Sequence, residues 1–590
     1  MKSISLPQPN VEDRILRVRN WVRNNLLMVL VISIVLFLVL VPVTRLLITS
    51  FQIGHPALPE GWSINNYTSA FSTPNFYESL GRTFWVAGLG TSVSLTFAIL
   101  VAWLVERTDM PFRNLAWAMI LIPMAVPNIL FAMGWTLLLS PNAGALNVFL
   151  RSLLDLVGIH VAKGPINIFS VGGLIFLDGI RGVTTIFLMV VGCFRMMDPT
   201  LEEAARVSGA SGVATFFKVT LPALSPAILA AGMYSFILSM ESFEAALAVG
   251  LPGGVFVLST LIYFTTRVQA PLDYGLGAVF GVVFMVIMMV LLIGYRRAVR
   301  NSERFSTITG KGFRPRIISI GKWRYPALGL FILFFLISIA LPFTILLWTS
   351  FMPSYRIPSL EVMHLLTLNN FIEILSDDRV YDVLWNTIVL MLVTATATMI
   401  LAFFVSWMIV RGQGKGKGKG VLDALVFLPL AIPGIVIAMA LLMAYLTPPM
   451  NYLGIYGTVW ILVLGLSVAY LPFCTRLMNG AIVQVHKELE EAAYVSGATT
   501  FRTLMQVTFP LLFPAFAAGW IWVAVHALRS FSIPLMLAGR RNQVFAVLLW
   551  EYWEEDISQA AAMGVLLIIA LIPLTLLMRR FVTQFSGQKG

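Results

Sequence analysis

The sequence predicts an all-α integral membrane protein whose twelve transmembrane helices form two homologous, parallel sets of six. Hydrophobic residues make up 58% of the 590 residues and charged residues only 12%, a balance outside that of soluble globular proteins. Twelve apolar runs are long enough to cross a bilayer as helices. Residues 201–232 and 489–520 are identical at 17 of 32 positions without a gap, so the chain contains an internal repeat.

The apolar runs divide the chain into two halves. We expect an N-terminal tail (1–25), a first repeat (26–295), a basic linker (296–325), a second repeat (326–578) and a C-terminal tail (579–590). The predicted spans of the first repeat are 26–43, 85–105, 115–139, 171–194, 226–249 and 274–295, and those of the second are 326–348, 384–410, 421–446, 459–478, 514–537 and 560–578. Because each half has six spans, both halves cross the membrane in the same direction.

Basic residues gather on one side of the predicted membrane. Residues 296–324 hold nine Lys and Arg against one acid, and Arg579 and Arg580 follow the last span. The opposite loop, 351–383, holds five acids against two arginines. The positive-inside rule therefore places both termini and both repeated stretches in the cytoplasm. The net charge of +12 is explained by this bias, so we expect a lipid bilayer and no nucleic acid as partner.

Each repeated stretch is predicted to form a compact elbow of two short helices, at 199–222 and 487–510. Glu202 and Glu203 are acids early in a helix, where the helix dipole favours them. Gly209 suits the left-handed turn that ends a helix, and Ser211 suits the N-cap of a second segment that stops before Pro222. The second copy has Glu490, Glu491, Gly497, Thr499 and Pro510 in these places. Loops that only connect transmembrane helices usually vary in sequence, so the repetition favours a different interpretation: two docking sites for a two-fold partner.

Spans three and nine carry matching proline pairs, Pro123 with Pro127 and Pro429 with Pro433. Two prolines four residues apart remove backbone hydrogen bonds and kink a helix. In a membrane such a kink survives where neighbours or water satisfy the freed groups. We expect a kink in each span, either beside a cavity or as a packing feature.

Charged residues inside predicted spans indicate a transport path, because each costs roughly 2.5 to 3.5 kcal/mol at mid-membrane. The offset of the repeat places Glu241 opposite Arg529, and opposite charges at equivalent positions can meet near a two-fold axis. We predict that both line or gate the path, with Glu244 and His526 nearby. A structural ion pair away from the substrate is the alternative.

The elbows resemble a known family signature, in which Glu-Ala-Ala is followed by Gly six residues after the Glu. It is carried by Glu203, Ala204, Ala205 and Gly209 and by Glu491, Ala492, Ala493 and Gly497, with Glu202 and Glu490 just before. This pattern is similar to that of permease subunits of binding-protein-dependent ABC importers. The resemblance covers nearly the whole chain and implies a type I importer permease fold, with each elbow acting as a coupling helix in a groove of an ATPase subunit.

The resemblance also implies a function and partners. The chain looks like a fused two-domain permease, similar to those of ferric iron importers, in a bacterial-type cytoplasmic (inner) membrane. The implied partners are two copies of a cytoplasmic ATPase subunit, which hold ATP and Mg, and an external periplasmic binding protein. Ferric iron is the expected substrate, and permeases for thiamine, phosphonate or polyamine are the alternatives.

A twelve-span secondary transporter driven by an ion gradient is the alternative from another class. Such proteins usually carry a charged, Gly-rich loop between spans two and three, whereas residues 106–114 contain no Gly. The sequence has no nucleotide-binding fingerprint and no metal or nucleophile constellation. We therefore expect a transport subunit that is not an enzyme, has no catalytic residues and holds no metal or cofactor itself.

Overall fold

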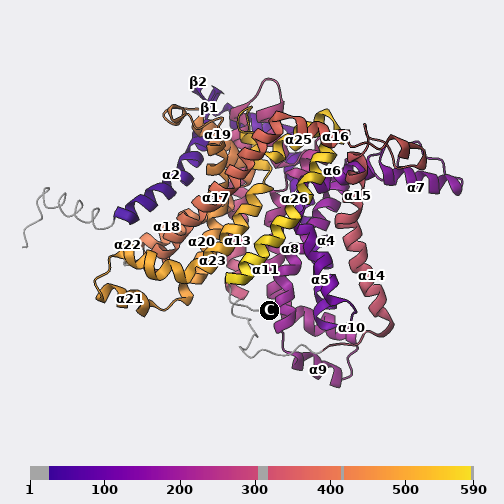
Figure 1. Cartoon of the computed structure of the whole chain (residues 1–590), viewed down its shortest axis with the longest axis horizontal. Helices are drawn as coiled ribbons and strands as arrows, with labels where there is room; N and C mark the ends of the chain where they lie inside the picture. Colours follow the sequence, from indigo (N-terminus) through magenta and orange to yellow (C-terminus); the bar gives the residue numbers. More distant parts are fainter. Residues whose placement is uncertain (1–25, 303–316, 413–416, 586–590) are drawn as a thin grey trace, which may run out of the picture.

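The computed structural model describes residues 26–302, 317–412 and 417–585, and this part of the chain is dominated by helices (Figure 1). Its one named sheet is the antiparallel hairpin of β1 (Gln52–His55) and β2 (Leu58–Trp62), with Gln52 opposite Trp62. Figure 1 shows the hairpin at the opposite end of the molecule from α9 (Pro199–Val207) and α21 (Lys487–Val495). The predicted N-terminal tail, residues 303–316 of the predicted linker and residues 586–590 of the predicted C-terminal tail lie outside the described residues.

Nine described helices are long and apolar enough to cross a membrane, and two bent helix pairs add two candidates. In the first half they are α2 (Leu26–Thr49), α4 (Pro74–Arg107), α8 (Val171–Met196), Gly212–Met240 and α13 (Tyr274–Ser302). In the second half they are Gly321–Ser350, α17 (Asp378–Arg411), α20 (Val459–Gln484) and Thr500–Leu528. Helix α26 (Ile557–Phe585) stands where the twelfth span is predicted.

Shorter helices connect these spans. They are α3 (Asn65–Ser72), α7 (Ala145–Leu156), α12 (Leu258–Tyr263), α16 (Asn369–Ser376), α24 (Ser532–Leu537) and α25 (Phe545–Glu555). The span Gly321–Ser350 is built from a 3₁₀ turn (Gly321–Trp323), α14 (Arg324–Phe335), a π turn (Leu336–Ala340) and α15 (Leu341–Ser350).

The proline pairs break spans three and nine rather than only kinking them. Helix α5 (Arg113–Leu121) meets α6 (Asn128–Leu139) at 98°, and α18 (Lys417–Phe427) meets α19 (Gly434–Tyr445) at 106°. The expected bends at the proline pairs are therefore confirmed, and each is sharp enough to divide its span into two helices. Val126 is extended because the ring of the following proline excludes the α region there, and Pro127 itself caps α6. Pro433 caps α19 in the same way.

Spans five and eleven end earlier than the sequence predicts. Helix α11 (Leu221–Met240) ends at Glu241, and α23 (Phe509–Leu528) ends at Arg529. The Glu241 amide donates to Leu238, three residues back, so the last turn tightens and the helix closes. The predicted helices 226–249 and 514–537 are thus each split at a charged residue, at equivalent points of the two repeats.

The first span of each half packs against the opposite half. Helix α2 lies against α19, and Val31 and Val35 share a core with Met399 of α17. Helices α14 and α15 lie against α5 and α6, and Phe331 shares a core with Val101 of α4. The two halves therefore interlock, and a larger central core contains side chains from both.

Equivalent side chains make equivalent hydrogen bonds in the two halves. The Asn66 amide donates to the carbonyls of Ser50 and Gln52, at 3.1 and 2.8 Å. Asn370 donates to Ser350 and Met352, at 2.9 and 2.7 Å. The two repeats thus share local geometry as well as sequence.

Candidate functional site

The two elbows are built alike. In the first, α9 begins at Asp198, whose carboxylate accepts from the Thr200 amide at 2.9 Å. It ends in a left-handed turn at Gly209, with φ +87°, and the Ala210 amide donates to the Ala205 carbonyl at 3.0 Å. In the second elbow, α21 ends at Gly497, with φ +86°. The predicted helix-ending turns are confirmed. Any other residue at these two positions would be strained by the positive φ alone, because the space around both glycines is open.

The second segment of each elbow begins as predicted but does not stop at the proline. The Ser211 hydroxyl accepts from the Ala214 amide at 3.2 Å, and Thr499 caps the second copy in the same way. α10 (Gly212–Thr215) then runs through a π turn (Phe216–Thr220) into α11, and α22 (Thr500–Thr503) through a π turn (Leu504–Thr508) into α23. The expectation that the second segment ends before Pro222 and Pro510 is wrong. Each proline follows the π turn and lies in the first turn of the next α-helix, where a helix tolerates a residue without an N–H.

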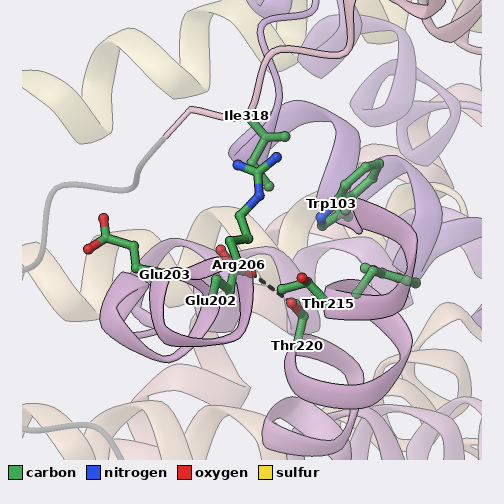
Figure 2. Close-up of a pocket in the computed structure, with 9 residues that line it drawn as sticks. Trp103, Glu202, Glu203, Arg206, Thr215, Thr220 and Ile318 are labelled. Carbon is green, nitrogen blue, oxygen red and sulfur yellow. Dashed lines mark hydrogen bonds between the residues drawn. The ribbon is translucent and has the colours of Figure 1, made fainter. Parts of the chain in front are cut away.

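Glu202 points inward and joins three elements of the first half. Its carboxylate contacts Arg107 Nη2 at 2.7 Å, at the end of α4, and accepts from Thr220 Oγ1 at 2.7 Å. Glu202 is 4% exposed and Arg107 is 0% exposed. Figure 2 shows Glu202 bonded to Thr220, with Glu203 pointing to the other side of α9.

Glu490 occupies the same place in the second half. Arg411, the last residue of α17, lies with its Nε 3.6 Å from the Glu490 carboxylate, and Thr508 Oγ1 donates to it at 3.1 Å. Trp407 also donates to Glu490, at 3.4 Å. We call each set an inner clamp. The first inner clamp is Arg107, Glu202 and Thr220, and the second is Arg411, Glu490 and Thr508.

The remaining signature residues lie on the outer side of the elbows. Glu491 is exposed and Glu203 is partly exposed, while the following alanines and both glycines are exposed or partly exposed; these are Ala204, Ala205, Gly209, Ala492, Ala493 and Gly497. Large apolar side chains flank them. Val207 is 89% exposed and its counterpart Val495 is 90% exposed. Each elbow therefore presents an apolar tip beside an acidic residue.

The end of the linker docks beside the first elbow. The Ile318 amide donates to the Arg107 carbonyl at 2.7 Å, and Asp109 accepts from the Ile320 amide at 2.9 Å and the Ser319 hydroxyl at 2.8 Å. These hydrogen bonds lower the pKa of Asp109 below its usual value, so the carboxylate is charged at neutral pH. Ile318 completes a hollow that Glu202 and Arg206 also line (Figure 2).

The inner clamps were not predicted from the sequence. Two signals pointed to them: Thr220 and Thr508 are identical residues of the repeat, and Arg107 and Arg411 end equivalent spans. Neither signal says that arginine and glutamate meet, because they are 95 residues apart in the first half.

The charged residues predicted for the path lie at or near the points where α11 and α23 end, which we call the breaks after spans five and eleven. Among the described ion pairs none joins Glu241 to Arg529, and Arg529 instead donates to the Met124 carbonyl at the α5–α6 break. One oxygen of Glu244 is buried without a hydrogen-bond partner in the described part of the chain. The His526 ring stacks on Trp522, with centroids 3.9 Å apart. The role of these four residues stays a prediction.

The two breaks meet through aromatic rings. Phe243 and Phe531 follow Glu241 and Arg529 at equivalent positions, and their centroids lie 6.3 Å apart. Phe243 also contacts Tyr263, and Phe531 contacts Trp550. Both phenylalanines are almost fully buried, with exposures of 3% and 1%. An apolar contact thus joins the two halves next to the charged residues.

Comparison with known proteins shows that the chain is similar to transport proteins. Residues 409–587 match the family model of the binding-protein-dependent transport system inner membrane component. The ferric transport system permease protein of Actinobacillus pleuropneumoniae is 22% identical over 92% of this chain and 76% of its own length. A putative ferric transport system permease protein of Haemophilus influenzae is 22% identical over 88% of this chain and 78% of its own length.

A bacterial ABC transporter involved in alginate import is similar in solved structure, with a TM-score of 0.38 and 17% identity over 45% of this chain and 96% of that chain. Residues 409–587 are therefore similar to the inner membrane components of binding-protein-dependent transport systems.

Proposed function

We propose that this protein is the membrane-spanning permease of an ABC importer that moves ferric iron, delivered by an external binding protein and driven by two separate ATPase subunits. The observation that carries the proposal is the pair of equivalent elbows, each with an exposed apolar tip. A two-fold partner needs two such sites at one face, and α9 and α21 lie at the same end of the molecule (Figure 1). Ferric transport permeases that align over most of the chain support the choice of cargo.

The charge bias supports the orientation. Arg296 and Arg297 lie near the end of α13, and Lys322 lies just before α14. Both helix ends are on the side of the elbows, so under the positive-inside rule both elbows and both termini are in the cytoplasm. ATP and Mg then belong to the partner subunits, and the chain transmits force without hydrolysing nucleotide. The binding protein docks on the opposite side, where the hairpin β1–β2 lies.

The transport path runs between the halves at the two breaks. Glu241, Glu244, His526 and Arg529 line it, and Phe243 and Phe531 close it on the external side. Burial of both rings between the halves supports this assignment, because a path along the pseudo-two-fold axis has to separate them. Opening requires the two phenylalanines to move apart.

The function is tested by uptake of radiolabelled ferric citrate into vesicles that contain the chain, its ATPase and its binding protein. We expect uptake to fall to background when the ATPase is made catalytically inactive and to survive collapse of the ion gradients. Excess unlabelled thiamine, phosphonate or polyamine is expected to leave uptake unchanged. Uptake that follows the ion gradient, or that a competitor abolishes, would contradict the proposal.

The closure is tested by a cysteine pair, Phe243→Cys with Phe531→Cys, in a chain whose Cys193 and Cys474 are replaced by alanine. We expect oxidation to link the two halves, which a protease site placed in the linker makes visible on a gel, and to stop uptake until a reductant is added. Each single cysteine variant is the control. A cross-linked chain that transports at the normal rate shows that the two rings do not close the path.

A further inference from the structure

We infer that the two inner clamps are positioning devices, which carry the movement of each elbow into the long helix beside it rather than contacting the ATPase. This inference rests on the proposed function. It assigns Glu202 and Glu490 a role different from that of their neighbours Glu203 and Glu491. The first pair is buried within the chain, whereas the second lies at its outer side.

The first inner clamp joins the elbow to the end of α4 and to the helix that follows the elbow in the chain. Glu202 lies on α9, Arg107 ends α4 and Thr220 lies where the helix Gly212–Met240 begins its α11 segment. Glu202 uses both carboxylate oxygens, one for each partner, at 2.7 Å. Charged hydrogen bonds shielded from water are strong and directional. A displacement of α9 therefore moves the end of α4 with it.

Helix α4 extends this connection across the membrane. It has 34 residues, which corresponds to a length of roughly 50 Å at 1.5 Å per residue. Near its outer end, Thr83 Oγ1 accepts from the Leu258 amide at 2.9 Å, at the start of α12. In the second half α17 also has 34 residues, and Thr387 Oγ1 accepts from the Phe545 amide at 2.9 Å. Each inner clamp is thus linked by one helix to the segment beyond the break.

The two clamps differ in strength. Within the described residues, Arg107 has no hydrogen-bond partner for Nε or Nη1, so Glu202 is its main contact. Arg411 lies farther from Glu490, at 3.6 Å, and its Nη2 also donates to the carbonyls of Ile482 and Val485. Loss of the carboxylate charge is therefore expected to weaken the first half more than the second.

The test uses the complete complex in proteoliposomes, with ATP hydrolysis and ferric citrate uptake measured together. For Glu202→Gln with Glu490→Gln, in which each amide oxygen can still accept a hydrogen bond from its arginine, we expect copurified ATPase and continued hydrolysis in the complexes that assemble. Uptake per ATP is expected to fall about tenfold, which is a factor of the size that coupling between two sites typically produces. Glu202→Gln alone is expected to lower this ratio more than Glu490→Gln alone. The matched control, Glu203→Gln with Glu491→Gln, is expected to lower ATPase binding and to keep the ratio in the complexes that remain.

If the glutamine double variant shows an unchanged ratio of uptake to ATP hydrolysis in assembled complexes, the inference is wrong. A parallel loss of ATPase binding, hydrolysis and uptake also contradicts it, because that result indicates a merely structural role. Thr220→Val with Thr508→Val keeps both ion pairs and guards against misfolding. This threonine double variant is expected to assemble normally and to lower uptake per ATP less than the glutamine double variant does. An unchanged ratio would count against a role of the inner clamps in coupling. The wild-type complex reports on the proposed function separately, because failure to bind an ATPase at all refutes that function whatever the variants do.

Discussion

Replacing Val207 and Val495 together by aspartate is expected to release the ATPase subunits and to abolish uptake. Both side chains are about nine-tenths exposed in the isolated chain, and we propose that they become buried in the complex. Burying an unpaired carboxylate in an interface costs on the order of 2 kcal/mol or more. A loss of that size weakens binding about 30-fold at each elbow.

The measurement is copurification of the ATPase with a tagged chain from detergent-solubilised membranes. Each single variant is expected to retain one elbow and an intermediate amount of ATPase. Leu360→Asp is the matched control, because Leu360 is 86% exposed and lies in the loop on the side opposite the elbows. Normal recovery of ATPase by the double variant would mean that the elbow tips are not the docking sites.

Arg107→Met is expected to be the most destabilising of the single substitutions proposed. It leaves the Glu202 carboxylate buried without its cation, and removal of one partner from a buried ion pair costs about 3 to 5 kcal/mol. The measurement is the thermal unfolding midpoint of the purified chain in detergent. Arg297→Met, which removes an exposed arginine near the C-terminal end of α13 that has no ion pair among the described residues, is the control and is expected to leave the midpoint unchanged.

Adding Glu202→Leu to Arg107→Met is expected to recover most of the lost stability, because an apolar pair of similar volume no longer buries a lone charge. If the single variant unfolds like the wild type, the Glu202 carboxylate is not held by Arg107. A double variant that stays as unstable as the single one would attribute the loss to packing of the arginine stem instead.

Local chemistry made several features predictable. Gly209 and Gly497 end the elbow helices because glycine takes a positive φ without strain, and Ser211 and Thr499 cap the next segment because their hydroxyls satisfy a free amide. Span boundaries were less predictable. Hydropathy does not distinguish a continuous helix from one that is broken at Pro127 or closed at Glu241, because apolar residues continue on both sides of each of these points.

The sequence alone determined the membrane class, the two-fold repetition, the elbows and their capping, because each depends on residues close together in the chain or on a count of apolar side chains. Only the tertiary structure decided which glutamate of each pair points inward, that Phe243 and Phe531 meet between the halves, and that each first span packs on the opposite half. Those outcomes depend on contacts between residues far apart in the chain. Whether a glutamate on such a helix is buried or exposed depends on whether an arginine far away in the chain contacts it. Neither the residue type of the glutamate nor its neighbours in the sequence indicate that contact.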